Sequence, residues 1–345
     1  MAWSLLGAEN VKKSVQGMIL RERLPHALLL TGPTGGGKFT LALDIAKAAN
    51  CLSLEADGSP CGTCLSCRKI QGSTHPDVFV IVPQGKSLII PIDRIRELRE
   101  LLAYMPYEGR NKVAIIREAE NFTEESGGAL LKTLEEPTQN TILILTAQTP
   151  SAVMSTLVSR CLNLRIPPLS RQAILEAILT RKGLSGPKAL LLAGLSRGAL
   201  GRALKIDPDI ALNLWEEIGN IFAAPPGSSR IQAGLAFSER LIQEFAGKKS
   251  AGDDLEVQSE KEYVDLFFLS LRLWFRDAAV AASVPDSLGF LEGPNPTPQF
   301  LKFVESFSVK QLPRYEWAIN LMVKNLSRFI KPLMVIENFW LRVLE

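Results

Sequence analysis

Four of the five cysteines lie close together in the sequence with the spacing of a metal site: Cys51, Cys61, Cys64 and Cys67. Gaps of two residues separate the last three, and a turn-rich segment, Asp57–Pro60, precedes them. Four thiolates in one loop are the ligands of a closed tetrahedral zinc site, which leaves no open position for catalysis. Thiols buried without a metal explain the cluster less well, because the residues between them offer little apolar cover. The spacing predicts structural Zn²⁺ and leaves open whether the loop contacts protein or DNA.

A glycine-rich segment, Gly32–Lys38, has the composition of a phosphate-binding loop. It follows an apolar run and precedes an amphipathic one, which is the context that such a loop requires. Gly32, Gly35 and Gly37 would let backbone N–H groups converge on phosphate oxygens, and Lys38 would reach the β- and γ-phosphates. A glycine-rich turn that binds nothing is the alternative.

The side chains that should hold Mg²⁺ beside this loop are absent. Phe39 follows the lysine where a Ser or Thr is expected, and Thr40 is one residue late, which turns its side chain by about 100° on a helix. After the apolar run Val113–Ile116, Arg117 replaces the expected aspartate, and its charge repels a divalent cation. Glu118 follows where a water-activating base is expected, but without metal it has little to act on. The sequence predicts no Mg²⁺ and no ATP hydrolysis by this chain, and leaves ATP binding open.

Apolar runs alternate with helix-period segments and predict the elements that position these residues. Five runs are expected to be strands: His26–Thr31, Val78–Val82, Val113–Ile116, Thr141–Ala147 and Leu162–Ile166. Helical spacing of Leu41, Ile45 and Ala48, and later of Ile95, Leu98 and Leu102, predicts crossover helices between strands. The alternation indicates an α/β domain with a mostly parallel, buried sheet.

The rest of the chain shows only helical patterns. The pair Pro167-Pro168 ends the last strand run and suggests a domain boundary. We therefore expect a core domain in residues 1–167 that carries the cysteine module (51–67), a small helical lid in residues 168–207, and a helical collar in residues 208–345 that serves oligomerisation.

The composition is that of a globular protein and excludes several classes. Of 345 residues, 46% are hydrophobic and 22% are charged, and the net charge of +3 is too small to argue by itself for nucleic-acid binding. The two histidines do not suffice for a site built from several imidazoles. No apolar run is long enough to cross a membrane, so we expect a cytoplasmic protein without a membrane partner.

Several motifs together resemble one family. They are Leu24–Pro33, the glycine loop, the four-cysteine module, His75–Asp77, Ala129–Pro137, Ser159–Cys161 and Gly201–Leu204. In this set the chain resembles the delta-prime subunits of bacterial DNA polymerase III clamp loaders, over most of its length but only loosely in the C-terminal helices. The resemblance implies an AAA+ module in two parts followed by a helical collar, in a pentamer that opens a ring-shaped sliding clamp and places it on primed DNA.

The resemblance also implies roles for individual residues. Ser159, Arg160 and Cys161 look like the family's arginine-finger motif, in which Arg160 would act in trans on the ATP site of a neighbouring subunit. Arg202 lies in a segment similar to the sensor-2 part of the lid. Cys161 is expected to be a small buried residue without a redox role. The alternative for Arg160 is an ordinary loop arginine at the surface.

The implied partners are the motor ATPase subunits and the delta subunit, bound through the collar and the Arg160 face, with the sliding clamp and primer-template DNA reached through the complex. One alternative is an ATP-hydrolysing motor subunit of the same loader, which Phe39 and Arg117 oppose. Another is a zinc-dependent nucleic-acid-binding protein on an ATPase-like scaffold. That would need a concentrated basic surface, whereas Arg94, Arg96 and Arg99 alternate with acidic residues.

Overall fold

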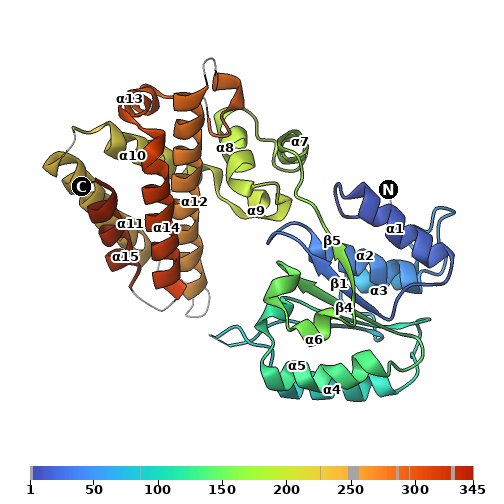
Figure 1. Cartoon of the computed structure of the whole chain (residues 1–345). Helices are drawn as coiled ribbons and strands as arrows, with labels where there is room; N and C mark the ends of the chain where they lie inside the picture. Colours follow the sequence, from blue (N-terminus) through green and yellow to red (C-terminus); the bar gives the residue numbers. More distant parts are fainter. Residues whose placement is uncertain are drawn as a thin grey trace. The chain divides into compact units, whose positions relative to one another are not determined.

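The computed structural model describes residues 3–85, 87–225, 227–247, 256–284, 287–294, 296–327 and 331–344. The chain forms two compact units, shown in Figure 1. The first comprises Met1–Leu169 together with Ala199–Arg202, and the second comprises Ser170–Gly198 and Ala203–Glu345. The separation of a lid (168–207) from a collar (208–345) remains a prediction.

A five-stranded parallel sheet forms the centre of the first unit. Its strands are β1 (Ala27–Thr31), β2 (Val78–Ile81), β3 (Lys112–Ile116), β4 (Thr141–Ala147) and β5 (Leu162–Arg165), in the order β2-β3-β4-β1-β5. Every residue of β1, β3 and β4 is buried, which explains their continuous apolar runs, whereas β5 at the edge is largely exposed. All five predicted strands are confirmed, with ends that differ by at most one residue.

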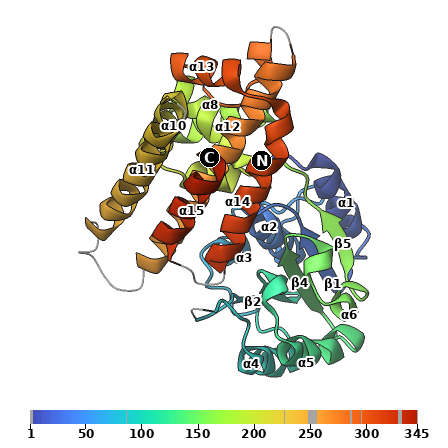
Figure 2. The ribbon, with the colours of Figure 1, turned by 60° about the vertical axis from the view of Figure 1, so that its left-hand side comes forward.

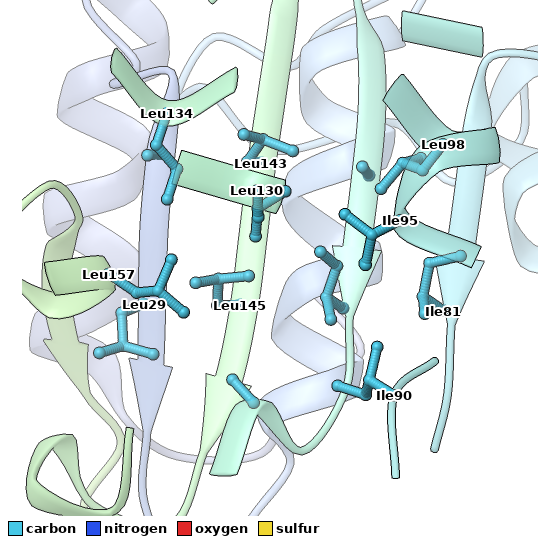
Figure 3. Packing of buried hydrophobic residues seen from close by; sticks show 14 of the residues in the cluster. Leu29, Ile81, Ile90, Ile95, Leu98, Leu130, Leu134, Leu143, Leu145 and Leu157 are labelled. Carbon is cyan, nitrogen blue, oxygen red and sulfur yellow. The ribbon is translucent and has the colours of Figure 1, made fainter. Parts of the chain in front are cut away.

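Helices cover both faces of this sheet. Its helical elements are α1 (Glu9–Leu20), α2 (Lys38–Asn50), α3 (Leu65–Gln71), α4 (Ile92–Ala103), α5 (Glu124–Glu135) and α6 (Ser155–Val158), with short 3₁₀ turns at η1 (Ala119–Asn121) and η2 (Pro150–Ala152). Successive strand residues point to opposite faces, so that Leu28 packs in the same cluster as Leu41 of α2, whereas Leu29 packs in the other cluster with Leu130 of α5. Figure 3 shows this second cluster, with Leu143 and Leu145 of β4 at its centre.

The described part of the second unit is entirely helical. It contains α7 (Arg171–Lys182), α8 (Gly186–Ser196), the second half of α9 (Leu200–Lys205), α10 (Pro208–Ala223), α11 (Ser228–Gly247), α12 (Glu256–Ser283), η3 (Ser287–Phe290), α13 (Pro298–Ser306), η4 (Val309–Gln311), α14 (Leu312–Ser327) and α15 (Pro332–Leu344). Figure 2 shows α12, α14 and α15 within this bundle, and α14 contacts both α12 and α15. Trp274, Trp340 and Phe267 are fully buried in this bundle.

The fold class predicted from the sequence, an α/β domain with a parallel sheet followed by a helical region, is thus confirmed. Within the described ranges, no helix combines the length and apolar character needed to cross a bilayer.

Candidate functional site

The glycine loop joins β1 to α2, as the sequence predicts. Gly32, Gly35 and Gly37 have φ angles of 154°, 79° and 90°, which other residues adopt only under strain. Gly37 directly precedes α2, so the N-terminus of this helix opens onto the loop. A β-carbon on Gly32 would lie 2.7 Å from the carbonyl oxygen of Ile166, so the first glycine is required by space as well as by conformation.

Lys38 folds back onto the loop. Its Nζ donates hydrogen bonds to the carbonyl oxygens of Gly32, at 2.8 Å, and Pro33, at 2.9 Å. Burial lowers the pKa of Lys38, the carboxylates of Glu120 and Glu118 act in the opposite direction, and Arg117 adds to the lowering. The ammonium group is therefore placed where a phosphate could reach it, with Arg117 within electrostatic range.

The two residues predicted to stand where magnesium ligands would lie, Arg117 and Phe39, contact each other. The guanidinium carbon of Arg117 lies 4.7 Å from the centre of the Phe39 ring, a cation–π arrangement. Arg117 follows β3 and Phe39 is the second residue of α2, so the contact joins two elements far apart in the sequence. Thr40 is the next residue of α2. From the sequence, Phe39 and Arg117 are two separate substitutions. In the structure, their side chains are in direct contact.

Glu118 adjoins this pair. Its backbone is left-handed, with φ of 55°, and its N–H donates to the hydroxyl of Thr146 at the end of β4. The carboxylate is about half exposed and lies 3.9 Å from Arg117 at its nearest oxygen. A base for water activation would thus be placed beside a cation rather than beside a bound metal. Thr146 was missed by sequence reasoning because only the pairing of β4 with β3 brings it here.

The segment Ala199–Arg202 belongs to the first unit and closes the loop on another side. The N–H of Gly201 donates to the carbonyl oxygen of Gly35 at 2.9 Å. A β-carbon on Gly35 would lie 2.7 Å from the backbone nitrogen of Arg202. The structure thus brings the backbone of the predicted residue Arg202 to the loop.

Asp44 is a further residue at this site that the sequence did not single out. It is fully buried on α2, and one carboxylate oxygen accepts the N–H groups of Ser4, at 2.7 Å, and Leu5, at 3.1 Å. Lys47 lies 3.4 Å from the other oxygen and balances the buried charge. Asp44 thereby holds Leu5 against Gly37. A β-carbon on residue 37 would collide with the Leu5 side chain, at 2.3 Å, so only glycine fits there. The place of Asp44 among the apolar residues of a helix was the sequence signal that could have predicted a buried, paired aspartate.

The four predicted cysteines converge. Their sulfur atoms all lie within 4.8 Å of one another, and those of Cys67 and Cys51 are 3.7 Å apart. A tetrahedron with metal–sulfur bonds of about 2.3 Å has sulfur atoms about 3.8 Å apart, so the cluster fits a metal ion closely. Cys51 follows α2, Cys64 caps the N-terminus of α3, and Cys67 lies in its first turn.

Backbone N–H groups point at these sulfur atoms and favour thiolates. The N–H groups of Cys64 and Thr63 lower the pKa of Cys61 to about 6. Burial raises the pKa of Cys51 and that of Cys67, so these two thiols need a cation nearby to lose their protons. A bound metal ion supplies that cation. The donor set and its geometry therefore fit a metal that prefers sulfur ligands.

The cysteine loop is tied to the N-terminal segment. The indole N–H of Trp3 donates to the hydroxyl of Ser59 at 2.7 Å, and Gln16 donates to Ser59 and to Asp57. Because α2 begins at Lys38 and ends just before Cys51, the metal site and the glycine loop lie at opposite ends of one helix. The N-terminal segment contacts both.

Arg160 lies between α6 and β5, as its place in the sequence predicts. Its Nη1 donates to the carbonyl oxygen of Thr156, at 2.9 Å, and to the hydroxyl of Ser159, at 3.3 Å. Its Nη2 donates to Glu135, the last residue of α5, at 2.6 Å. The side chain retains about a third of its exposure. Cys161 instead packs against the core cluster of Figure 3, and burial raises its pKa to about 11, which makes it a poor nucleophile.

Asp77, in the motif His75–Asp77, has a structural task. It is buried, and its carboxylate accepts the N–H groups of Tyr107, Glu108 and Gly109 at 2.7–2.9 Å. Burial raises its pKa, but these three hydrogen bonds outweigh that effect and lower it below the usual value. Asp77 therefore fixes the turn before β3.

The amino-acid sequence of this chain is similar to those of known proteins. Residues 7–170 match a family described as "DNA polymerase III, delta subunit". The delta' subunit of DNA polymerase III from Bacillus subtilis is 36% identical over 187 residues, covering 54% of this chain and 55% of that protein. The tau subunit from Escherichia coli is 33% identical over 291 residues, covering 83% of this chain and 44% of that protein.

A solved DNA polymerase III gamma subunit-related protein from Thermotoga maritima aligns with 96% of this chain and 98% of its own, at 15% identity and a TM-score of 0.41. The chain spans about half the length of the curated relatives it matches. The resemblance to delta-prime subunits is confirmed by the family match and by the delta' relatives.

The tight approach at the loop predicts different outcomes for two glycine-to-alanine changes. Gly32→Ala should destabilise the chain by roughly 1–3 kcal/mol, because of its φ angle and the Ile166 carbonyl. Gly128→Ala, at an open position inside α5, should instead stabilise it by about 0.5–1 kcal/mol. Urea unfolding of both variants measures this, and equal stabilities would contradict the loop geometry.

Proposed function

We propose that this chain is a non-catalytic clamp-loader subunit of the delta-prime type, which acts in the cytoplasm and supplies Arg160 to the ATP site of a neighbouring subunit. The observation that carries the proposal is the contact of Arg117 with Phe39. A permanent cation and an aromatic ring in contact, at the two sequence positions where Mg²⁺ ligands are expected, support a chain that does not bind this metal. The match of residues 7–170 to the delta family supports the assembly in which such a chain would work.

The chemistry of phosphoryl transfer explains why the chain would not hydrolyse ATP. The metal ion bridges the β- and γ-phosphate oxygens and neutralises charge that develops during transfer. Phe39 has no oxygen to offer this ion, and Arg117 repels it. Lys38 and the loop backbone are retained, so the proposal does not require that the loop lack nucleotide.

The guanidinium of Arg160 could complete the ATP site of a neighbouring subunit. This group is always charged, and its planar fork can contact two phosphate oxygens at once. A finger of this kind is worth roughly 10³–10⁵ in rate at the site that it completes. Its exposure and its attachment to the ends of α5 and α6 support this use.

The partners follow from the same proposal. Motor ATPase subunits and a delta subunit would bind through the helices of the second unit and through the Arg160 face. The sliding clamp and primer-template DNA would be reached through the complex. The whole would form part of a DNA polymerase III holoenzyme.

A motor subunit of the same loader is the rival supported by a specific observation, since the Escherichia coli tau match covers more of this chain than the delta' matches do. Phe39 and Arg117 argue against it. A zinc-dependent nucleic-acid binder is less well supported, because Arg94 and Arg96 on α4 pair with Glu97 and Asp93.

We further propose that the cysteine cluster holds Zn²⁺. Four thiolates in tetrahedral reach suit zinc, and such sites are structural. The ion would stabilise the loop that contacts Trp3 and Gln16 and would take no part in ATP chemistry.

The zinc proposal predicts one equivalent of zinc per chain. Replacing Cys61 and Cys64 together by Ser should abolish it and lower the unfolding temperature, because four-thiolate sites contribute about 10 kcal/mol or more of binding energy. Cys161→Ser is the control and should keep the metal. Metal analysis of the purified variants gives the answer. A wild-type ratio near zero, with no stability loss in the double variant, would exclude the site.

The isolated chain should hydrolyse ATP no faster than its Lys38→Ala variant, with or without primed DNA, because both groups that should hold Mg²⁺ are absent. The double change Phe39→Thr and Arg117→Asp should recover Mg²⁺-dependent nucleotide binding, without requiring turnover. Phosphate release and equilibrium nucleotide binding measure the two effects. Robust Mg²⁺-dependent turnover by the unmodified chain would favour the motor-subunit alternative.

Arg160→Ala should leave folding, zinc content and assembly intact. DNA-stimulated ATP hydrolysis and clamp loading by the reconstituted loader should fall by about two-fold or more, since one of several sites loses a group worth roughly 10³–10⁵ there. Arg160→Lys should rescue little, because an ammonium lacks the fork. Arg181→Ala, at an exposed arginine of α7, is the matched control. Unchanged rates for Arg160→Ala would make Arg160 an ordinary surface residue.

A further inference from the structure

The guanidinium of Arg160 is held at both of its terminal nitrogen atoms. Nη1 is bound by the carbonyl oxygen of Thr156 and the hydroxyl of Ser159, at 2.9 and 3.3 Å. Nη2 is bound by Oε1 of Glu135, at 2.6 Å. Thr156 belongs to α6 and Glu135 ends α5, and these helices pack on each other. The side chain is therefore fixed to two rigid elements although it is partly exposed.

We propose that Glu135 is a positioning residue that fixes the Arg160 side chain in the orientation used at the neighbouring subunit's ATP site. This inference rests on the proposed function of Arg160. It adds that the orientation of the arginine is set within this chain, before any contact with the neighbour, and that one carboxylate of α5 sets it.

The number of N–H groups on Arg160 indicates that Glu135 orients this side chain and does not withhold it from a neighbouring subunit. Arginine has five N–H groups, and the contacts with Thr156, Ser159 and Glu135 use three of them. Two N–H groups have no partner among the described residues, and a two-pronged contact with phosphate oxygens needs two. Glu135 and α6 can thus keep hold of the guanidinium while its remaining donors reach across an interface.

A fixed arginine is also the more effective one. A free arginine side chain has about 2 kcal/mol of rotamer freedom, part of which is lost when it binds a phosphate. Contacts that restrict the side chain beforehand reduce this loss, which is the general benefit of preorganisation. Because the pair is exposed, its contribution to folding stability should be small.

The position of Glu135 in its helix is an independent observation. Glu135 is the last residue of α5 and Glu136 follows it, so two carboxylates lie where the helix dipole disfavours negative charge. Glu135 is compensated by Arg160, whereas Glu136 is exposed and forms no described ion pair. A locally unfavourable charge that contacts a functional side chain is expected where function, rather than stability, determines the residue.

The test compares Glu135→Gln with its neighbour Glu136→Gln in the reconstituted loader. Glu135→Gln has the same size but loses the charge, and it should lower kcat for DNA-stimulated ATP hydrolysis by about two-fold without changing KM for ATP. Glu136→Gln should change neither value. Added to Arg160→Ala, the Glu135→Gln change should have no further effect, because no arginine remains to be positioned. The unfolding temperature of each isolated variant reports any structural damage.

The outcomes separate this inference from the proposed function. If Arg160→Ala lowers kcat but Glu135→Gln does not, Arg160 acts without help from Glu135 and the inference is wrong. A higher kcat in Glu135→Gln would mean that Glu135 restrains the arginine, which also overturns it. Equal losses in Glu135→Gln with and without Arg160 would show a general structural effect. If Arg160→Ala itself has no effect, the proposed function fails.

Discussion

The contact between Arg117 and Phe39 is the constraint on which the proposed function of this chain depends. The loop before it keeps the glycines, the lysine and the helix N-terminus that are typical of a phosphate-binding loop, so the loop alone would suggest an ATPase. The Arg117 guanidinium lies 4.7 Å from the Phe39 ring, and we propose that this pair takes the place of both protein ligands of the metal ion. Under the proposed function, the chemistry that remains available to the chain is that of its exposed cations, and Arg160 is one that the fold holds at both terminal nitrogen atoms.

This constraint explains why an inactive site would keep so complete an architecture. Arg160 lies between α6 and β5 and is bound to the end of α5, and these elements belong to the unit in which β1, between β4 and β5, leads into the glycine loop. Asp44 and the cysteine loop hold the N-terminal segment against the opposite side of the same sheet. Losing the loop or the metal site would therefore disturb the unit that presents the arginine.

Much of this could be predicted from the sequence, because the signals are local. The strands β1, β3 and β4 are continuous apolar runs, and the cysteine spacing alone brings four sulfur atoms together. The contacts from which the function is proposed are not local. Arg117 meets Phe39 and Glu135 meets Arg160 only after β3, α2, α5 and α6 have packed. The sequence indicates that Asp44 is a buried charged residue. Its hydrogen-bond partners, Ser4 and Leu5, lie 39 or more residues away and cannot be predicted locally.

The most direct test of a chain that acts in trans is a crossed comparison in the reconstituted loader. DNA-stimulated ATP turnover is measured with this chain as Lys38→Ala, which disables its own loop, and as Arg160→Ala, which disables its outward-facing group. The account predicts that turnover survives the first change and falls with the second. The reverse result, turnover lost with Lys38→Ala and kept with Arg160→Ala, would mean that the chain hydrolyses ATP itself and would contradict the account.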